Sequence, residues 1–207
     1  MIIIQLDDVY EYAAHNTGEL TSIEVTPAYG FLSTVNATDL PDIQVFIFYY
    51  KKNSTKLKGY LGSYKKSIAQ ALIKENENHD VAYIAVSKAH PKSRGYVTLD
   101  SPSPYDKPII VPEYFTNAED VETSIRGIKQ QISFTNTPAY QKNGAEFIHI
   151  PIDECDRFDF QSDDYFRCYI KYFGSGDNHP VGTSKMRPDL DSDAVVLLKI
   201  CDKMMVG

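Results

Sequence analysis

The chain has 207 residues, of which 43% are hydrophobic and 24% are charged, and its formal net charge is −7. This is the balance of a globular protein with an apolar core, so wholesale disorder, collagen-like repeats and coiled-coil rods are excluded. The longest apolar run, residues 43–50, is far shorter than the roughly 18 residues needed to cross a bilayer. The acidic charge opposes nucleic-acid binding, so neither nucleic acid nor a membrane is an expected partner.

The first third of the chain predicts short helices and strands. A helix is expected over 7–14, one or two short strands within 23–35, and a strand over 43–50. Six lysines lie between Lys51 and Lys66 with no acidic residue among them. Together with the asparagine, serine and glycines between them, they predict a mobile, solvated loop rather than a phosphate-binding patch.

The central part of the chain predicts extended structure. A helix is expected over 67–74, and strands are expected over 81–87 and 96–99. Five prolines fall between Pro91 and Pro112. Because proline fixes φ and donates no backbone hydrogen bond, this stretch should be extended and rich in turns.

Two clear helices follow. Asn117 predicts the N-cap of a helix over 118–134, and Ser162 predicts the N-cap of a helix that ends near residue 173. A short strand is expected between them, over 147–150. The first helix carries its apolar residues on one face at Val121, Ile125, Ile128 and Ile132. The second has an apolar stripe of Phe166, Tyr169, Ile170 and Phe173.

These elements mix without regular βαβ alternation, which predicts an α+β fold with a mostly antiparallel sheet and helices packed on one face. The strands over 43–50, 81–87 and 96–99 are expected to share that sheet. The two long helices are expected to bury Ile125, Ile128, Phe166 and Ile170. Burying one such side chain contributes about 1.5–3 kcal/mol, so an aspartate at position 128 should unfold the domain.

The cysteines and the glycosylation triplets do not decide whether the chain forms a disulfide or enters the secretory pathway. The cysteines are Cys155, Cys168 and Cys201, and none belongs to a CxxC pair. A bond between Cys155 and Cys168 and an unpaired structural role for them are both compatible with the sequence. Two N-x-[ST] triplets, at Asn36 and Asn53, permit a secretory history, although such triplets often arise by chance. The N-terminus does not resemble a signal peptide.

No metal site is predicted. Asp189, Asp191 and Asp193 alternate as in an EF-hand loop, but Ala194 and Ile200 occupy the positions that need glycine and glutamate. The acidic cluster over 153–159 is typical of a solvated loop. The sequence has no P-loop, HExxH, GxSxG or dinucleotide fingerprint.

The loop over 174–186 is different. It contains three glycines and one histidine, and His179 directly precedes Pro180, with Gly182 two positions after that proline. A rigid turn of this kind gives the imidazole a defined direction, which a proton-transfer residue requires. On composition alone, a plain surface histidine is the alternative.

His179–Thr183, continuing through Ser184 and Lys185 to Met186, resembles the HPVGT-x-x-M signature of the glucose-methanol-choline (GMC) oxidoreductases. Further segments resemble the family's substrate-binding part in the same order. They are 17–22, 30–32, 41–44, 91–95, 101–106, 112–114 and 118–127. Cys155, Ser162, Asp163, Arg167 and Cys168 resemble the insect branch, which includes glucose dehydrogenase-like and ecdysone oxidase-like proteins. The order and spacing hold from Glu11 to Val196.

The resemblance implies a fold like that of the C-terminal domains of FAD-linked reductases, FAD as cofactor, and a small-molecule alcohol, sugar or sterol as substrate. It implies that His179 is the general base that takes the hydroxyl proton while the hydride moves to the flavin. It also implies that Asn178, Pro180 and Val181 line the flavin-facing wall. Neither the substrate nor the choice between oxidase and dehydrogenase follows from it.

The sequence also departs from the family. We expect one substrate-binding domain over 1–196, within which residues 88–196 form the family's C-terminal motif region. We expect residues 197–207 to be a divergent tail. We also expect the FAD-binding half to be absent. Asn178 stands where an aromatic residue is common. Two hypotheses follow: a fragment of an FAD-dependent oxidoreductase, or a non-catalytic truncated or degenerate module without bound FAD.

In either case we expect the isolated chain to be inactive. An apolar face that normally packs on the FAD half should favour self-association. Full-length relatives are often secreted, and the compartment of this chain stays open.

Overall fold

A computed structural model of the chain describes residues 6–18, 28–35, 40–176, 179–182, 186–187 and 196–197. The chain forms two compact units. Unit 1 consists of Met1–Lys92 and Asn117–Tyr172, and unit 2 of Ser93–Thr116 and Phe173–Gly207. The single domain expected over 1–196 stays a prediction.

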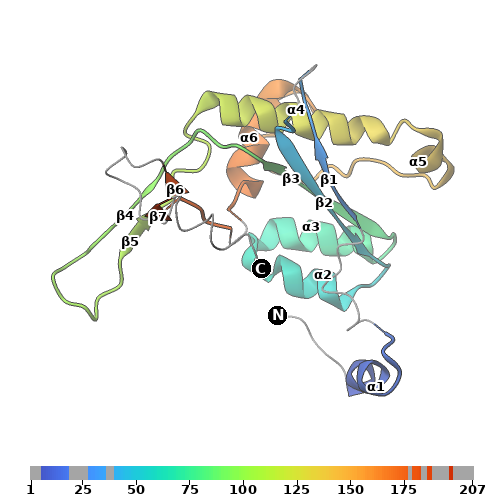
Figure 1. Cartoon of the computed structure of the whole chain (residues 1–207). Coiled ribbons are helices and arrows are strands. Elements are labelled where there is room, and N and C mark those ends of the chain that lie inside the picture. The colour runs from blue at the N-terminus through green and yellow to red at the C-terminus, as the bar shows by residue number, and fades with distance from the viewer. Residues whose placement is uncertain are drawn as a thin grey trace. The chain divides into compact units, whose positions relative to one another are not determined.

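A three-stranded antiparallel sheet organises unit 1 (Figure 1). Its strands are β1 (Ala28–Leu32), β2 (Ile43–Tyr50) and β3 (Val81–Lys88), with β2 in the centre. Val45 of β2 lies opposite Gly30 on one side and Val86 on the other. The apolar run of β2 forms this central strand, and the predicted α+β fold with a mostly antiparallel sheet is confirmed.

Helix α4 (Ala118–Phe134) packs on one face of this sheet. Asn117 caps it as predicted, because its side chain accepts a hydrogen bond from the backbone N–H of Glu119 at 2.9 Å. A Cβ on Gly127 would lie 2.7 Å from Cγ1 of Val86 and 3.1 Å from Cδ1 of Ile43, so only glycine permits this close contact. The backbone of α4 at Gly127 therefore packs directly against side chains of β2 and β3.

The buried face of α4 is more polar than the sequence predicts. Ile125 is buried as expected, but Ile128 is only half-buried. The expectation for Ile128 is wrong because the helix turns a face of small and polar residues inward instead. These are Asp120, Thr123, Ser124, Gly127 and Gln131.

A buried ion pair explains part of this polarity. Nζ of Lys88, at the end of β3, lies 3.4 Å from the Asp120 carboxylate, and the two side chains are only 9% and 3% exposed. Asp120 also accepts the backbone N–H of Lys92 at 2.9 and 3.0 Å, and Lys88 donates to Oγ1 of Thr123 at 3.1 Å. The group joins the end of the sheet to the first turns of the helix, with partners for each charge.

The other face of the sheet carries an aromatic cluster. The Tyr60 ring lies 6.3 Å from Phe48 and 5.4 Å from Tyr83, measured between centroids. Phe48 and Tyr83 are direct cross-strand partners, and their parity is opposite to that of Ile43 and Val86, so they point away from α4. Figure 1 accordingly shows α4 on one side of the sheet and α2 and α3 on the other. The helices thus cover both faces of the sheet rather than the one face expected.

The lysine-rich segment that supplies Tyr60 is helical. It forms α2 (Thr55–Tyr60) and η2 (Leu61–Ser63), followed by α3 (Lys66–Asn76). The predicted loop is therefore wrong, because Leu57 and Leu61 are buried and hold the segment against the core. Most of its lysines are exposed, as expected.

The remaining elements of unit 1 are helical. They are α1 (Leu6–His15), α5 (Pro138–Lys142) and α6 (Asp163–Phe173), which ends at the boundary between the units. Ser162 caps α6 by accepting the N–H of Tyr165 at 3.1 Å, and Phe166 and Ile170 are buried as predicted. No strand forms over 147–150, where a strand was predicted. No helix within the described residues is both long and apolar enough to span a bilayer.

Unit 2 contains two small sheets. β4 (Tyr96–Thr98) pairs antiparallel with β5 (Ile109–Val111), and β6 (Met186–Arg187) pairs parallel with β7 (Val196–Leu197). The predicted membership of 96–99 in the main sheet is therefore wrong. The proline-rich stretch folds back on itself, and its strand finds its partner locally.

Candidate functional site

The predicted base, His179, lies on an exposed loop of unit 2 that follows α6. Its backbone N–H donates to the carbonyl of Gly176 at 2.8 Å, which closes a short turn directly before the histidine. Gly182 has φ of +107°, a conformation that side chains other than glycine rarely adopt. The loop therefore has a hydrogen-bonded turn before His179 and a glycine-specific conformation after it. The role expected for this frame stays a prediction.

Tyr114 packs against the turn before His179. A Cβ on Gly176 would lie 1.9 Å from Oη of Tyr114, so the phenol fills the space that a side chain would need. Tyr114 is itself held between Glu113 and Phe115, whose φ values are +47° and +59°. Tyr114 and Gly176 belong to two segments that are far apart in the sequence, and the structure brings them into contact.

A second close approach fixes the base of the β4–β5 hairpin. A Cβ on Gly95 would lie 2.1 Å from the carbonyl oxygen of Val111 and 2.6 Å from that of Pro112. Gly95 ends the 91–95 segment and Pro112 begins the 112–114 segment, both of which resemble family motifs. The close contacts at Gly95 and Gly176 thus both lie in unit 2, which carries His179.

The hairpin and the histidine loop expose many apolar side chains. Leu99 is 77% exposed, Ile110 67% and Val181 86%. Further exposed members of this set in unit 2 are Tyr96, Val97, Tyr105, Ile109 and Tyr114. Such a concentration on so small a unit is typical of a surface that another protein part covers.

Two other predicted site residues are also placed. Pro180 and Val181 follow His179 in the exposed loop, whereas Asn178 lies outside the described residues. No cluster of three or more histidine, cysteine or acidic side chains that could hold a metal occurs in the described part of the chain.

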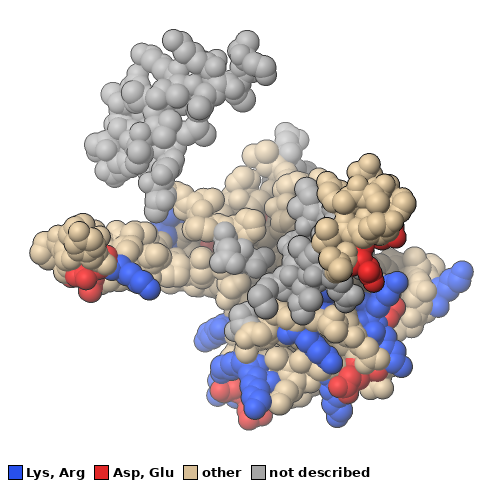
Figure 2. Space-filling view, turned by 90° about the horizontal axis from the view of Figure 1, so that it is seen from below, with Lys and Arg blue, Asp and Glu red and all other residues tan. Residues whose placement is uncertain are grey.

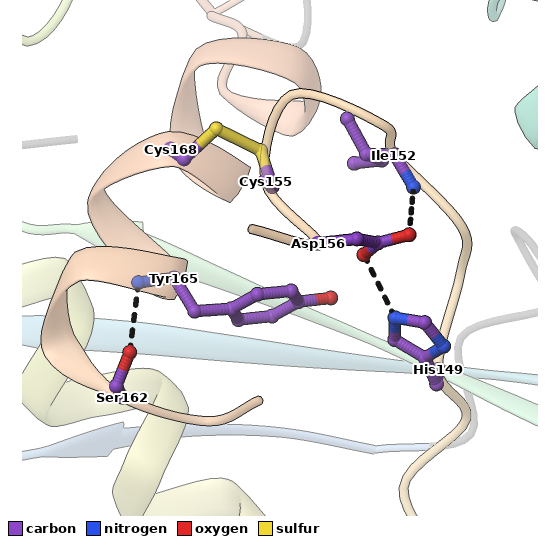
Figure 3. Close-up of a disulfide and its surroundings, with 7 residues drawn as sticks. All are labelled: His149, Ile152, Cys155, Asp156, Ser162, Tyr165 and Cys168. Atoms are coloured by element: carbon purple, nitrogen blue, oxygen red, sulfur yellow. Dashed lines mark hydrogen bonds and ion pairs between the residues drawn. A yellow bond between two sulfur atoms is a disulfide. The ribbon is translucent and has the colours of Figure 1, made fainter. Parts of the chain in front are cut away.

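A disulfide joins Cys155 to Cys168 in unit 1, with their Cα atoms 5.4 Å apart (Figure 3). Of the two alternatives that the sequence left open, the structure contains the bond. It ties an irregular loop to α6. Cys155 is fully buried, so the bond is part of the core beneath that loop.

A histidine–carboxylate pair closes the same loop. Nε2 of His149 lies 2.9 Å from Oδ1 of Asp156, whose Oδ2 accepts the backbone N–H of Ile152 at 3.2 Å (Figure 3). The Tyr165 hydroxyl is buried nearby and has no hydrogen-bond partner among the described residues. Burial, and secondarily the charge of Asp156, raise the pKa of Tyr165 to about 12, so this phenol stays protonated at neutral pH.

Comparison with known proteins identifies the family. The family model described as GMC oxidoreductase matches residues 91–199, which is just over half of the chain. This chain belongs to the GMC oxidoreductase family. The matched range includes the β4–β5 hairpin, α4, the disulfide and the His179 loop.

The chain is similar to insect members of that family. It is 31% identical over 188 residues to a glucose dehydrogenase (FAD, quinone) of Drosophila pseudoobscura pseudoobscura, covering 90% of this chain and 28% of the relative. It is 32% identical over 130 residues to an ecdysone oxidase of Spodoptera littoralis, covering 63% of this chain and 21% of the relative. The chain thus spans 28% and 21% of the length of these two curated relatives.

Proposed function

We propose that this chain is the substrate-binding part of an FAD-dependent oxidoreductase that oxidises CH–OH groups, with His179 as the general base. The observation that carries the proposal is the HPVGT motif, whose residues 179–182 lie on an exposed loop. The turn before them is closed by the Gly176 carbonyl and contacted by Tyr114. Family membership supports the reaction class.

The chemistry assigned to this chain is proton transfer. A ring nitrogen of His179 takes the proton of the substrate hydroxyl, which leaves an alkoxide from which the carbinol hydride departs more easily. FAD, when bound, supplies the hydride acceptor. The imidazole must be held in a defined position for this transfer. The hydrogen bond from the backbone N–H of His179 to the carbonyl of Gly176 constrains the main chain that carries the ring.

The exposed residues after the base fit contact with a flavin. Pro180 and Val181 present apolar surface without covering from other described residues of unit 2, and Val181 is 86% exposed. A planar ring system packs well against such surface. Together with Asn178, these residues are the proposed wall beside the flavin.

The substrate class is proposed at the level of a hydroxyl donor. The relatives named above are called glucose dehydrogenase and ecdysone oxidase, so an alcohol, sugar or sterol hydroxyl fits both. The second candidate is a non-catalytic, degenerate module, and the feature that favours it is Asn178, which stands where an aromatic residue is common in the family.

A chimera tests the role of His179. Residues 11–196 replace the corresponding part of a full-length relative, and His179→Ala is compared with His90→Ala, a second exposed histidine outside the loop. We expect His179→Ala to lower turnover by about 100-fold or more with the flavin spectrum unchanged, and His90→Ala to change neither. Full turnover in His179→Ala would show that it is not the base.

A measurement on the chain alone can exclude the second candidate. We expect the purified 207-residue chain to lack flavin absorbance and alcohol oxidation, because a base without a hydride acceptor cannot run the reaction. Tightly bound FAD in this protein would exclude the non-catalytic module. An inactive chimera with His179 intact would instead favour it.

A further inference from the structure

The turn between β2 and α2 presents one of the two N-x-[ST] triplets, Asn53-Ser54-Thr55. Asn53 is exposed and has φ of +61°, so it stands at the tip of the turn. Thr55 is the first residue of α2 and is also exposed. We propose that Asn53 is an acceptor site for an N-linked glycan.

The turn is held by other residues. Asn76, which is 2% exposed, donates from Nδ2 to the carbonyls of Lys51 and His79 at 3.0 and 3.1 Å, and its Oδ1 accepts the N–H of Ser54 at 2.8 Å. The N–H of Asn53 donates to the carbonyl of Asn76 at 2.8 Å. The buried amide of Asn76 therefore fixes the path of the chain on both sides of Asn53.

The middle residue of the triplet has a structural task. Oγ of Ser54 accepts the N–H of Leu57 at 3.3 Å and caps α2. In contrast, the carboxamide of Asn53 and the hydroxyl of Thr55 have no hydrogen-bond partner among the described residues. The two side chains that a glycosyltransferase must recognise are thus the two that the fold does not use.

Backbone conformation gives asparagine a second reason to occur here. Asparagine tolerates positive φ better than most residues, so Asn53 alone is explained by the turn. The turn does not explain a hydroxyl at position 55, two residues further on. Substitutions at Thr55 therefore separate the two explanations without changing the conformation at Asn53.

The disulfide provides independent support. Disulfides such as Cys155–Cys168 persist mainly in oxidising compartments, of which the lumen of the endoplasmic reticulum is one. N-linked glycans are added in the same lumen. A chain that forms this bond in that lumen meets the transferase there.

The modification is a group transfer from a lipid-pyrophosphate-linked oligosaccharide. Nδ2 of Asn53 attacks the anomeric carbon of the first sugar, and an N–C bond forms as the bond from that carbon to the pyrophosphate oxygen breaks. The lipid pyrophosphate leaves with the bonding electrons, and one proton from the amide passes to a base of the transferase.

A glycan on Asn53 would keep the surrounding surface exposed to solvent. Lys51, Lys52 and Lys58 are exposed near the turn, and Figure 2, seen from the side of α2 and α3, shows basic side chains spread over this surface. A bulky sugar among them is incompatible with burial against another domain. The β2–α2 face would then stay free in the intact protein.

The test is secretion of the full chain from cultured insect cells behind a cleavable leader. All variants carry Asn36→Gln, which removes the other triplet. Peptide mass spectrometry before and after digestion with a peptide N-glycosidase reports occupancy, and thiol labelling reports the disulfide. We expect a glycan on Asn53 that disappears in both Asn53→Gln and Thr55→Ala and persists in Thr55→Ser.

Thr55→Ala is the decisive variant because it keeps Asn53 and its turn. If Asn53→Gln fails to be secreted, Thr55→Ala against Thr55→Ser still decides the question. A secreted chain that has formed Cys155–Cys168 but carries unmodified Asn53 would overturn the proposal. So would a glycan that survives Thr55→Ala.

Discussion

Single residues decide how closely the elements of this protein approach each other. Gly127, Gly176 and Gly95 each lie where a Cβ would come within 2.7 Å of a neighbouring atom. The sequence marks these positions as glycine but does not say which atom occupies the space. Helix propensity alone makes Gly127 an unfavourable residue in the middle of the predicted helix 118–134. The close approach of the sheet explains why glycine occurs there.

Gly127→Ala should destabilise unit 1. Alanine favours helix over glycine by about 1 kcal/mol, but forcing a methyl group into a packed contact costs about 1–3 kcal/mol. Val86 and Ile43 are themselves packed, so we expect the cost to exceed the gain. Thermal unfolding measures the difference. Gly62→Ala is the control, since nothing lies within 4 Å of a Cβ there, and equal melting temperatures for both variants would contradict the argument.

Asp42 makes stability depend on acid pH. Burial alone would raise the pKa of its carboxyl, but hydrogen bonds from the hydroxyl and the N–H of Thr34, with help from Arg126, outweigh burial and lower it. Because the folded pKa lies below the unfolded value, this stabilisation is complete above the unfolded pKa and is lost as pH falls through the folded one.

Asp42→Asn should therefore lower the melting temperature at neutral pH. The gap between the variant and the unmodified protein should narrow as pH falls below the ordinary carboxyl pKa of 3.8. Thermal unfolding at a series of pH values checks both statements. A gap that stays constant down to the lowest pH at which the protein folds would show that the charge of Asp42 contributes nothing.

At the scale of elements, periodicity and capping predicted most of the regular structure. The helices now seen as α4 and α6 begin at their predicted caps, and β2 and β3 lie where β-branched and aromatic runs placed them. Two predictions of local structure failed because contacts with distant parts of the chain decide these segments. The lysine-rich segment became helical because Leu57 is buried, and 147–150 stayed irregular beside the disulfide loop.

The disulfide should contribute strongly to the loop that it closes. Cys155 and Cys168 are 13 residues apart, and a loop of this size predicts stabilisation of about 3 kcal/mol in the chain-entropy model. Cys155→Ala/Cys168→Ala should lower the melting temperature to about that of the reduced protein, and reductant should not lower it further. Cys201→Ser is the control and should keep the response to reductant. A double variant as stable as the oxidised protein would contradict this.

At the scale of the whole molecule, the site depends on recognition of a family rather than on physics alone. Composition and turn chemistry predict a rigid turn in the His179 loop. In the structure, the backbone N–H of His179 donates to the Gly176 carbonyl and Gly182 has a positive φ. Its assignment as a base came from the resemblance, which agrees with membership in the GMC family. The contact between Tyr114 and Gly176 was out of reach, because the two residues are 62 positions apart and no periodic pattern connects them.

The exposed hairpin of unit 2 should make the isolated chain associate with itself. Leu99 and Ile110 are 77% and 67% exposed, and each removes apolar area from water if a second molecule covers it. We expect sedimentation of the 207-residue chain to show concentration-dependent oligomers. Leu99→Lys/Ile110→Lys should shift them toward monomer without lowering the melting temperature, because neither side chain is buried within the chain. Leu6→Lys, at a residue of α1 that is 85% exposed, adds one charge in unit 1 and should leave the oligomers unchanged. Oligomers that persist in the hairpin variant would place the contact elsewhere.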